Sequence, residues 1–147
     1  MEDGVSLLVY WNNESICYSV GAGEDISFDC ELINRYNCYV YSFDLTPLAI
    51  GYVNNFIKLI DSEKSILTDC IAQPWYTIRK NNVNNFHFYP YGIWSKDGEK
   101  PFYAPIYQQS ISHTILNLQS TNEYFMAECY KIKSNMNKYW HDHLDLL

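Results

Sequence analysis

Two glycines separated by a single residue, Gly21 and Gly23, interrupt the chain between a short apolar run and a helical pattern. The apolar run covers residues 16–20, and residues 26–36 carry apolar side chains at the i, i+4 and i+7 positions of a helix. Glycine lets a backbone approach a ligand closely, and the first turn of a helix has unpaired N–H groups. A strand, a glycine turn and a helix in this order therefore predict a small-ligand site that includes Gly21, Ala22 and Gly23.

The residues after the turn bear on the charge of that ligand. A dinucleotide site would have a third glycine at position 26, where this chain has Ile26. Glu24 and Asp25 add two carboxylates, and two unit charges about 4 Å apart interact by roughly 4 kcal/mol at an effective dielectric constant of about 20. These acids repel a pyrophosphate and attract an ammonium or sulfonium, which favours S-adenosylmethionine. The alternative is that Asp25 only caps the helix and that Glu24 only suits its dipole.

Length and charge narrow the class of protein. The 147 residues suit one domain with a real core, and the net charge is −7. All of this excess charge lies before residue 58, where eight acids accompany one base, Arg35, whereas nine acids balance nine bases after it. Nucleic-acid binding needs clustered Lys and Arg, so we expect no nucleic-acid partner.

The cysteines and the N-terminus bear on the compartment. Five scattered cysteines without a C-x-x-C pair predict reduced, mostly buried thiols. The N-terminal residues lack the pattern of a signal peptide, and no apolar run approaches the length of a membrane span. We therefore expect a cytoplasmic protein without a membrane partner.

The order of the elements predicts an α/β fold. Strands at residues 16–20, 38–43 and 86–89 alternate with helices at 26–36 and from Thr46-Pro47 onward, which is the βαβ pattern of a doubly wound, mostly parallel sheet. Ligands bind such sheets at the carboxyl ends of the strands. Asp44 ends the second strand, 21 residues after Gly23, where an acid can accept hydrogen bonds from both ribose hydroxyls. In that role its loss would weaken ligand binding more than the unliganded fold; alternatively, Asp44 caps a turn.

Other segments are expected to complete the domain. Residues 5–10 read as a further strand, Trp75-Tyr76 as a buried anchor, and residues 95–100 as a hairpin-type turn. Residues 125–139 fit one helix, or a strand at 126–132 followed by a helix capped at Ser134.

Several motifs together resemble one family. Residues 19–29 (SVGAGEDISFD), 40–47 (VYSFDLTP), 88–94 (FYPYGIW) and 111–115 (ISHTI) resemble the S-adenosylmethionine-dependent methyltransferases of the FkbM type. The resemblance implies the Rossmann-like fold of class I methyltransferases over nearly the whole chain. It also implies that Gly21, Ala22 and Gly23 lie against the methionine end of the cofactor.

The resemblance assigns the adenosine end of the cofactor as well. It implies that Asp44 holds the ribose, that Leu45 packs on the adenine, and that Gly92 and Ile93 border the other side of the adenine. With Glu24, Asp25 and Ile26 at the turn, these residues make up the expected cofactor site. The family commonly has an acid where Ser19 stands and a glycine where Asp25 stands.

The resemblance also implies that residues 1–147 are the front part of such a domain. Residues 144–147 resemble the first residues of a buried fourth strand beside the glycine-turn strand. A short strand there would leave a sheet edge exposed, so self-association is expected.

The expected function is therefore methyl transfer from S-adenosylmethionine, to oxygen of a small-molecule or glycan-like acceptor. The alternatives are a non-catalytic module that binds cofactor or a partner and, less favoured by Ile26 and the acids, an NAD(P)-binding oxidoreductase. No catalytic residue is singled out. His113 could act as a general base, and the 141–143 segment (HDH) could bind a metal, but structural roles in loops are the favoured interpretation of both.

Overall fold

The computed structural model describes residues 10–63, 70–72, 77–105, 113–118 and 120–147. Its centre is a parallel sheet of β1 (Ile16–Val20), β2 (Tyr39–Phe43) and β5 (Phe86–Tyr89), in the order β1-β2-β5. The three predicted strands are confirmed, and their carboxyl ends lie on one edge of the sheet because the strands are parallel. The described chain is thus a mixed α/β structure.

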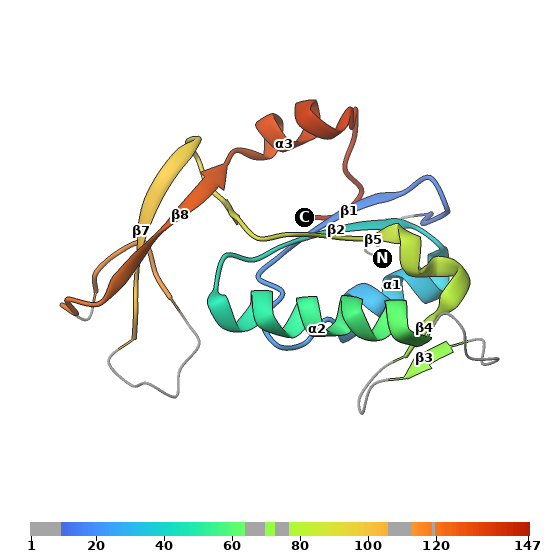
Figure 1. The fold of residues 1–147 in the computed structure, drawn as a ribbon. Helices are drawn as coiled ribbons and strands as arrows, with labels where there is room; N and C mark the ends of the chain where they lie inside the picture. Colours follow the sequence, from blue (N-terminus) through green and yellow to red (C-terminus); the bar gives the residue numbers. More distant parts are fainter. Residues whose placement is uncertain (1–9, 64–69, 73–76, 106–112, 119) are drawn as a thin grey trace, which may run out of the picture.

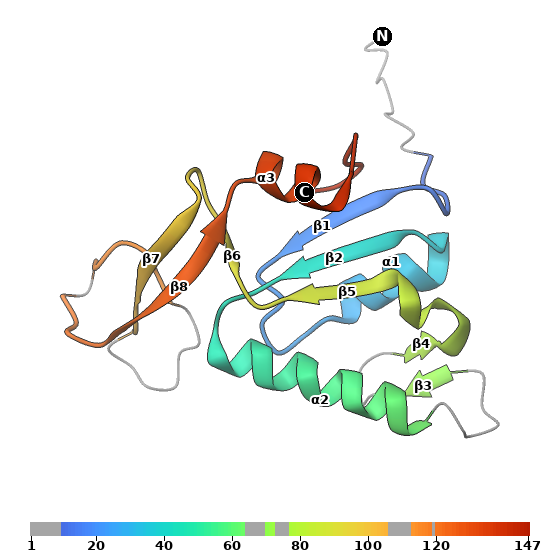
Figure 2. The same ribbon diagram turned by 45° about the horizontal axis from the view of Figure 1, so that its top comes forward.

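Helices cover both faces of this sheet. Figures 1 and 2 show α1 (Ser27–Tyr36) and α2 (Pro47–Glu63) on one face and α3 (Ile132–Tyr139) on the other. Asn37 ends α1 in the left-handed conformation, with φ of 55°, and its N–H binds the Ile33 carbonyl, as a helix C-cap should.

Alternation along the strands divides the core into two layers. Cys17 and Val40 are fully buried against α1 and α2, in a cluster that also contains Ile26 and Ile33. Tyr18 and Phe43 instead face α3, where they pack with the ring of Tyr91 and many half-buried tyrosines. Each buried apolar side chain of this size contributes roughly 1.5–3 kcal/mol of transfer free energy.

A fourth segment pairs with β1 on its free side. The N–H of Tyr18 donates to the Leu146 carbonyl at 2.9 Å, and the N–H of Asp145 donates to the Ile16 carbonyl at 2.8 Å. Cys17 and Leu146 form a parallel β-bridge. The expected position of residues 144–147 beside the glycine-turn strand is therefore confirmed.

A second, mixed sheet stands beside the carboxyl ends of the central strands (Figure 2). It contains β6 (Gly92–Ile93), β7 (Gly98–Tyr103) and β8 (Tyr124–Tyr130), in the order β6-β8-β7. The predicted hairpin-type turn at residues 95–100 is wrong, because β6 and β7 do not pair with each other. Both pair with β8, β6 in parallel and β7 antiparallel.

The segment from β8 to α3 decides between the two interpretations of residues 125–139. A single helix is wrong, because β8 runs to Tyr130 and α3 begins only at Ile132. The predicted cap is wrong as well, since Ser134 lies inside the helix. The cap comes from Asp97, whose carboxylate accepts hydrogen bonds from the Lys131 N–H at 2.6 Å and the Ser134 hydroxyl at 2.7 Å.

The region after α2 contains elements without a clear sequence pattern. They are β3 (Cys70–Ala72), which pairs antiparallel with β4 (Thr77–Arg79), and the 3-10 helix η1 (Lys80–Asn85). The predicted anchor Trp75-Tyr76 and nearly all of the strand predicted at residues 5–10 lie outside the described residues.

Two further expectations concern the thiols and the membrane. Cys17, Cys30, Cys38 and Cys129 are free and buried, as expected. None of the helices in the described ranges combines the length and the apolar character that crossing a membrane requires.

Candidate functional site

A cleft of about 590 Å³ opens where the central strands end and the second sheet begins. The ends of β1 and β2 form one wall, with Gly21, Gly23, Asp44 and Leu45 in the turns that follow them. Gly92, Ile93 and the second sheet form the opposite wall. Six of the ten residues predicted for the cofactor site line this cleft: Gly21, Gly23, Asp44, Leu45, Gly92 and Ile93.

The glycine turn has the backbone that its sequence predicts. Gly21 has a φ of 89° and Gly23 a φ of 58°, both in the region that side chains other than glycine rarely adopt. The Gly21 N–H donates to the Phe43 carbonyl at 2.8 Å, which ties the turn to the end of β2. A Cβ atom placed on either glycine would meet no protein atom within 4 Å. The turn thus presents open backbone to the cleft.

Asp44 joins the two turns that form the first wall. Its Oδ2 accepts a hydrogen bond from the Gly23 N–H at 2.9 Å. Its Oδ1 accepts bonds from the Thr46 N–H at 2.8 Å and the Thr46 hydroxyl at 2.7 Å. The turn-capping role is therefore present, and Asp44 is largely buried while still lining the cleft.

The opposite side of the cleft depends on a close backbone approach at Gly92. A Cβ atom there would lie 2.6 Å from Leu45 Cδ2 and 3.0 Å from Cys129 Sγ. Only glycine fits between these two side chains without displacing them. Leu45 thus packs against Gly92, and both Leu45 and Ile93 line the cleft.

The remaining four predicted residues do not line the cleft. Ala22 and Ile26 are buried in the core between β1 and α1. Glu24 and Asp25 are exposed on the turn, and Asp25 Oδ1 accepts a bond from the Ser27 N–H at 2.8 Å at the start of α1. Bonding to the Ser27 hydroxyl and to the Ser27 N–H lowers the pKa of Asp25. Asp25 therefore binds the first N–H of α1, as the capping alternative requires, although the N-cap residue itself is Ile26.

The second sheet and the segment after residue 112 supply a wall that the sequence did not predict. Phe102 is buried in this wall, and His113 packs its ring edge-on against Phe125 at 5.2 Å between centroids. His113 was considered from the sequence as a general base, and it does reach the cleft. The other lining residues of this wall are Trp94, Thr114, Ile115, Leu116 and Leu118.

The cleft is chemically simple. Among its described lining residues Asp44 is the one carboxylate, His113 is the one imidazole, and none is Lys or Arg. Most of the remaining lining is aliphatic or aromatic. Such a surface suits a ligand with a flat apolar part and a few hydroxyl groups.

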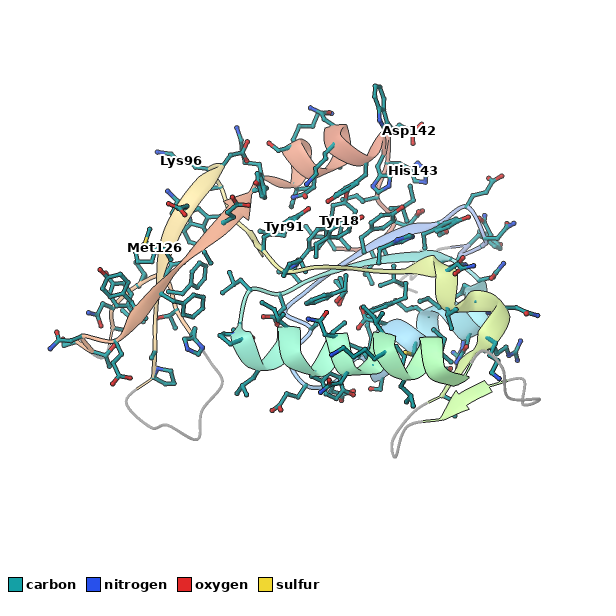
Figure 3. The ribbon with its side chains drawn as sticks, in the orientation of Figure 1. Tyr18, Tyr91, Lys96, Met126, Asp142 and His143 are labelled. Atoms are coloured by element: carbon teal, nitrogen blue, oxygen red, sulfur yellow. The ribbon has the colours of Figure 1, made fainter. Side chains whose placement is uncertain are left out.

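His141 and His143 do not line the cleft. His141 Nδ1 lies 2.9 Å from the Tyr18 hydroxyl, on the face of the sheet that α3 covers. Figure 3 shows Tyr18 and Tyr91 between α3 and the sheet, with Asp142 and His143 beyond the end of the helix. Within the described ranges, no three His, Cys, Asp or Glu side chains gather closely enough to hold a metal ion.

Comparison with protein-family models, with curated proteins and with solved structures gave no match. The fold and the cleft define a mixed α/β protein with a ligand-sized cleft at the carboxyl ends of its parallel strands.

Proposed function

We propose that the cleft binds S-adenosylmethionine and that the chain is an S-adenosylmethionine-dependent methyltransferase with a Rossmann-like fold. One observation carries the proposal. Three separate sequence segments that the family resemblance singled out, the glycine turn, Asp44-Leu45 and Gly92-Ile93, line the same cleft. They follow the carboxyl ends of different strands, which the parallel sheet brings to one edge.

The cleft offers a complementary group for each part of this cofactor. The open backbone at Gly21 and Gly23 suits the methionine end, which must come close to the turn. Leu45 and Ile93 both line the cleft and offer apolar contact to the flat adenine. A carboxylate has about four acceptor positions, and the protein uses three of those on Asp44. One position on Oδ2 therefore remains for a ribose hydroxyl, one fewer than the sequence led us to expect.

A dinucleotide suits the cleft less well. A pyrophosphate needs positive charge or a full set of helix N–H groups, and the described lining residues include no Lys or Arg. Asp44 and the exposed acids of the turn add repulsion. NAD or NADP as the ligand, and hence an oxidoreductase, is the weaker proposal.

Methyl transfer places modest demands on the protein. The sulfonium already activates the methyl group, so the protein chiefly aligns the acceptor and excludes water. We propose an oxygen acceptor on a small or glycan-like molecule, which follows from the family resemblance. A cofactor-binding module without catalysis is the alternative, and an acceptor-dependent assay with a labelled methyl group separates the two.

Calorimetric titration tests the cofactor directly. We expect S-adenosylmethionine and S-adenosylhomocysteine to bind and NAD and NADP to bind much more weakly. Leu45→Ala should weaken adenosyl binding by about 1–2 kcal/mol, because it removes apolar contact with the base. Leu48→Ala removes the same side chain from an exposed position on α2 and should leave binding unchanged. Binding of NAD with neither adenosyl ligand would refute the proposal.

A further inference from the structure

Asp29 is an acid buried beneath the glycine turn. It lies in the first turn of α1 and is 2% exposed. Its Oδ1 atom has no hydrogen-bond partner in the described part of the chain. A buried carboxylate without full hydrogen bonding is costly, so such a group needs a compensating interaction.

Two serines place this carboxyl under both turns of the cleft's first wall. Ser19 of β1 and Ser42 of β2 are register partners, and each stands two residues before a cleft residue, Gly21 and Asp44 respectively. Both hydroxyls adjoin Asp29 and favour its charged form. The Ser42 hydroxyl is itself fully buried and completes no hydrogen bond among the described residues.

The surroundings of Asp29 do not balance its charge. Burial raises the pKa of Asp29 to about 6, and the serines and its own backbone N–H oppose this rise. The other titratable groups that act with it are the Asp25 carboxylate and the buried thiols of Cys17 and Cys30. None of these groups is basic. At neutral pH the wall beneath the turn therefore carries an uncompensated negative charge.

We propose that Asp29 is a positioning residue whose buried charge selects a ligand with a cationic end at the Gly21–Gly23 turn. The inference rests on the proposed function, because the methionine end of S-adenosylmethionine carries an ammonium and a sulfonium against a single carboxylate and so has a net positive charge. Asp29 touches no ligand in this arrangement; it acts through the field across the turn and through the first turn of α1. The compensating charge is the ligand itself.

Linkage gives the proposal a measurable consequence. If ionised Asp29 strengthens binding of a cation, then the cation must lower the pKa of Asp29 by the same factor. Affinity for the cationic ligand should therefore rise as the pH rises through about 6 and level off above it. The α-amino group of the ligand stays protonated in this range, since its ordinary pKa is about 7.7–8.0.

The test compares a charged with an uncharged adenosyl ligand. We would titrate S-adenosylmethionine and 5′-methylthioadenosine, which lacks the charged amino-acid end, into the wild-type protein and Asp29→Asn at pH 7.5. Asp29→Asn keeps the shape and should weaken S-adenosylmethionine binding roughly tenfold, within the usual range of coupling between sites, while leaving methylthioadenosine binding unchanged. Glu31→Gln removes an exposed charge from the same helix and should change neither affinity.

Each other outcome has a definite meaning. Equal weakening of both ligands in Asp29→Asn would overturn the inference and leave the proposed function standing, because Asp29 would then only support the fold. Failure of both ligands to bind the wild-type protein would overturn both. The pH profile needs no substitution: a constant ratio of the two wild-type affinities between pH 5 and 7 would also overturn the inference.

Discussion

At the scale of single residues, Asp29 makes a prediction about stability as well as about binding. Its folded-state pKa of about 6 lies above the value of roughly 3.9 for an unfolded Asp. The unliganded protein should therefore be most stable with Asp29 protonated, and should lose up to about 3 kcal/mol as the pH rises from about 4 to above 6. Asp29→Asn should lack this loss. Urea unfolding at pH 4 and pH 8 measures it, and an equal difference in unfolding free energy between the two pH values in both proteins would contradict it.

Asp44, in contrast to Asp29, is expected to stabilise the unliganded fold. From the sequence, its loss was expected to affect the ligand more than the unliganded fold. In the structure, Asp44 accepts three hydrogen bonds from the protein. A single bond to a charged group contributes about 1.5–3 kcal/mol, but bonds that share one carboxylate do not add up in full. We expect Asp44→Ala to lower unfolding free energy by about 2–4 kcal/mol and also to weaken adenosyl binding.

Thr46→Val is the matched control for Asp44. It removes only the hydroxyl bond to Oδ1 and leaves the bond from the Gly23 N–H in place. It should destabilise the fold less than Asp44→Ala and keep most of the ligand affinity. If Asp44→Ala melted at the wild-type temperature, the hydrogen bonds described here would not contribute to stability.

At the scale of secondary structure, the cap of α3 links two elements that are far apart in sequence. Asp97 is exposed, and its bonds to the Lys131 N–H and the Ser134 hydroxyl lower its pKa. A lowered pKa means that the cap stabilises above the unfolded pKa and is lost as the pH falls through the folded one. Asp97→Asn should therefore fray the start of α3 at pH 7 and matter less at pH 3.

Hydrogen exchange of the α3 amides measures this effect. Glu99→Gln is the control, because it removes an exposed acid two residues away that the helix does not use. Unchanged protection of residues 135–139 in Asp97→Asn would show that α3 is held by its packing on Tyr91 and the central sheet instead.

Elements held by contacts between residues close in sequence were predicted correctly, whereas elements held by contacts between distant residues were not. The strands and helices from residue 16 to 60 were predictable because their signals are local: a glycine turn, Pro47 at a helix start and Asn37 at a helix end. The pairing within the second sheet was not, because β7 and β8 stabilise each other across about 20 intervening residues. The Asp97 cap acts across 34 residues and leaves no local pattern.

The candidate site shows the same division. Residues next to the strand ends could be predicted, whereas Phe102 depends on where the second sheet packs. The buried position of Asp29 could have been predicted from the helical spacing of residues 26–36. It falls three residues after Ile26 and four before Ile33, on the buried face, so an acid stands where an apolar residue is expected.

At the scale of the whole molecule, the central sheet has an edge at residues 144–147. These residues pair with β1 on one side, and no strand pairs with their other side among the described residues. Leu147 is 64% exposed beside it. Unpaired edges with apolar side chains favour association, so light scattering should show particle mass rising with protein concentration.

A charge on this edge should reduce the association. Leu147→Lys adds a strongly hydrated group to the edge, and edge lysines oppose strand pairing between molecules. Tyr124→Lys changes an equally exposed side chain on the second sheet and should have no such effect. A monomer at every concentration in the wild-type protein would show that this edge does not pair.

The pairing of β1 with residues 145 and 146 also sets an order of events during synthesis. The Ile16 N–H donates to Asp145 Oδ2 across 129 positions of the chain. At about 5–20 residues per second, a ribosome needs roughly 6–26 s to add that many residues. During that time β1 can pair only with β2, and the backbone groups on its other side have no strand partner. Residues 145 and 146 follow all three strands β1, β2 and β5 in the chain, so the outer side of β1 stays exposed on the nascent chain until they emerge.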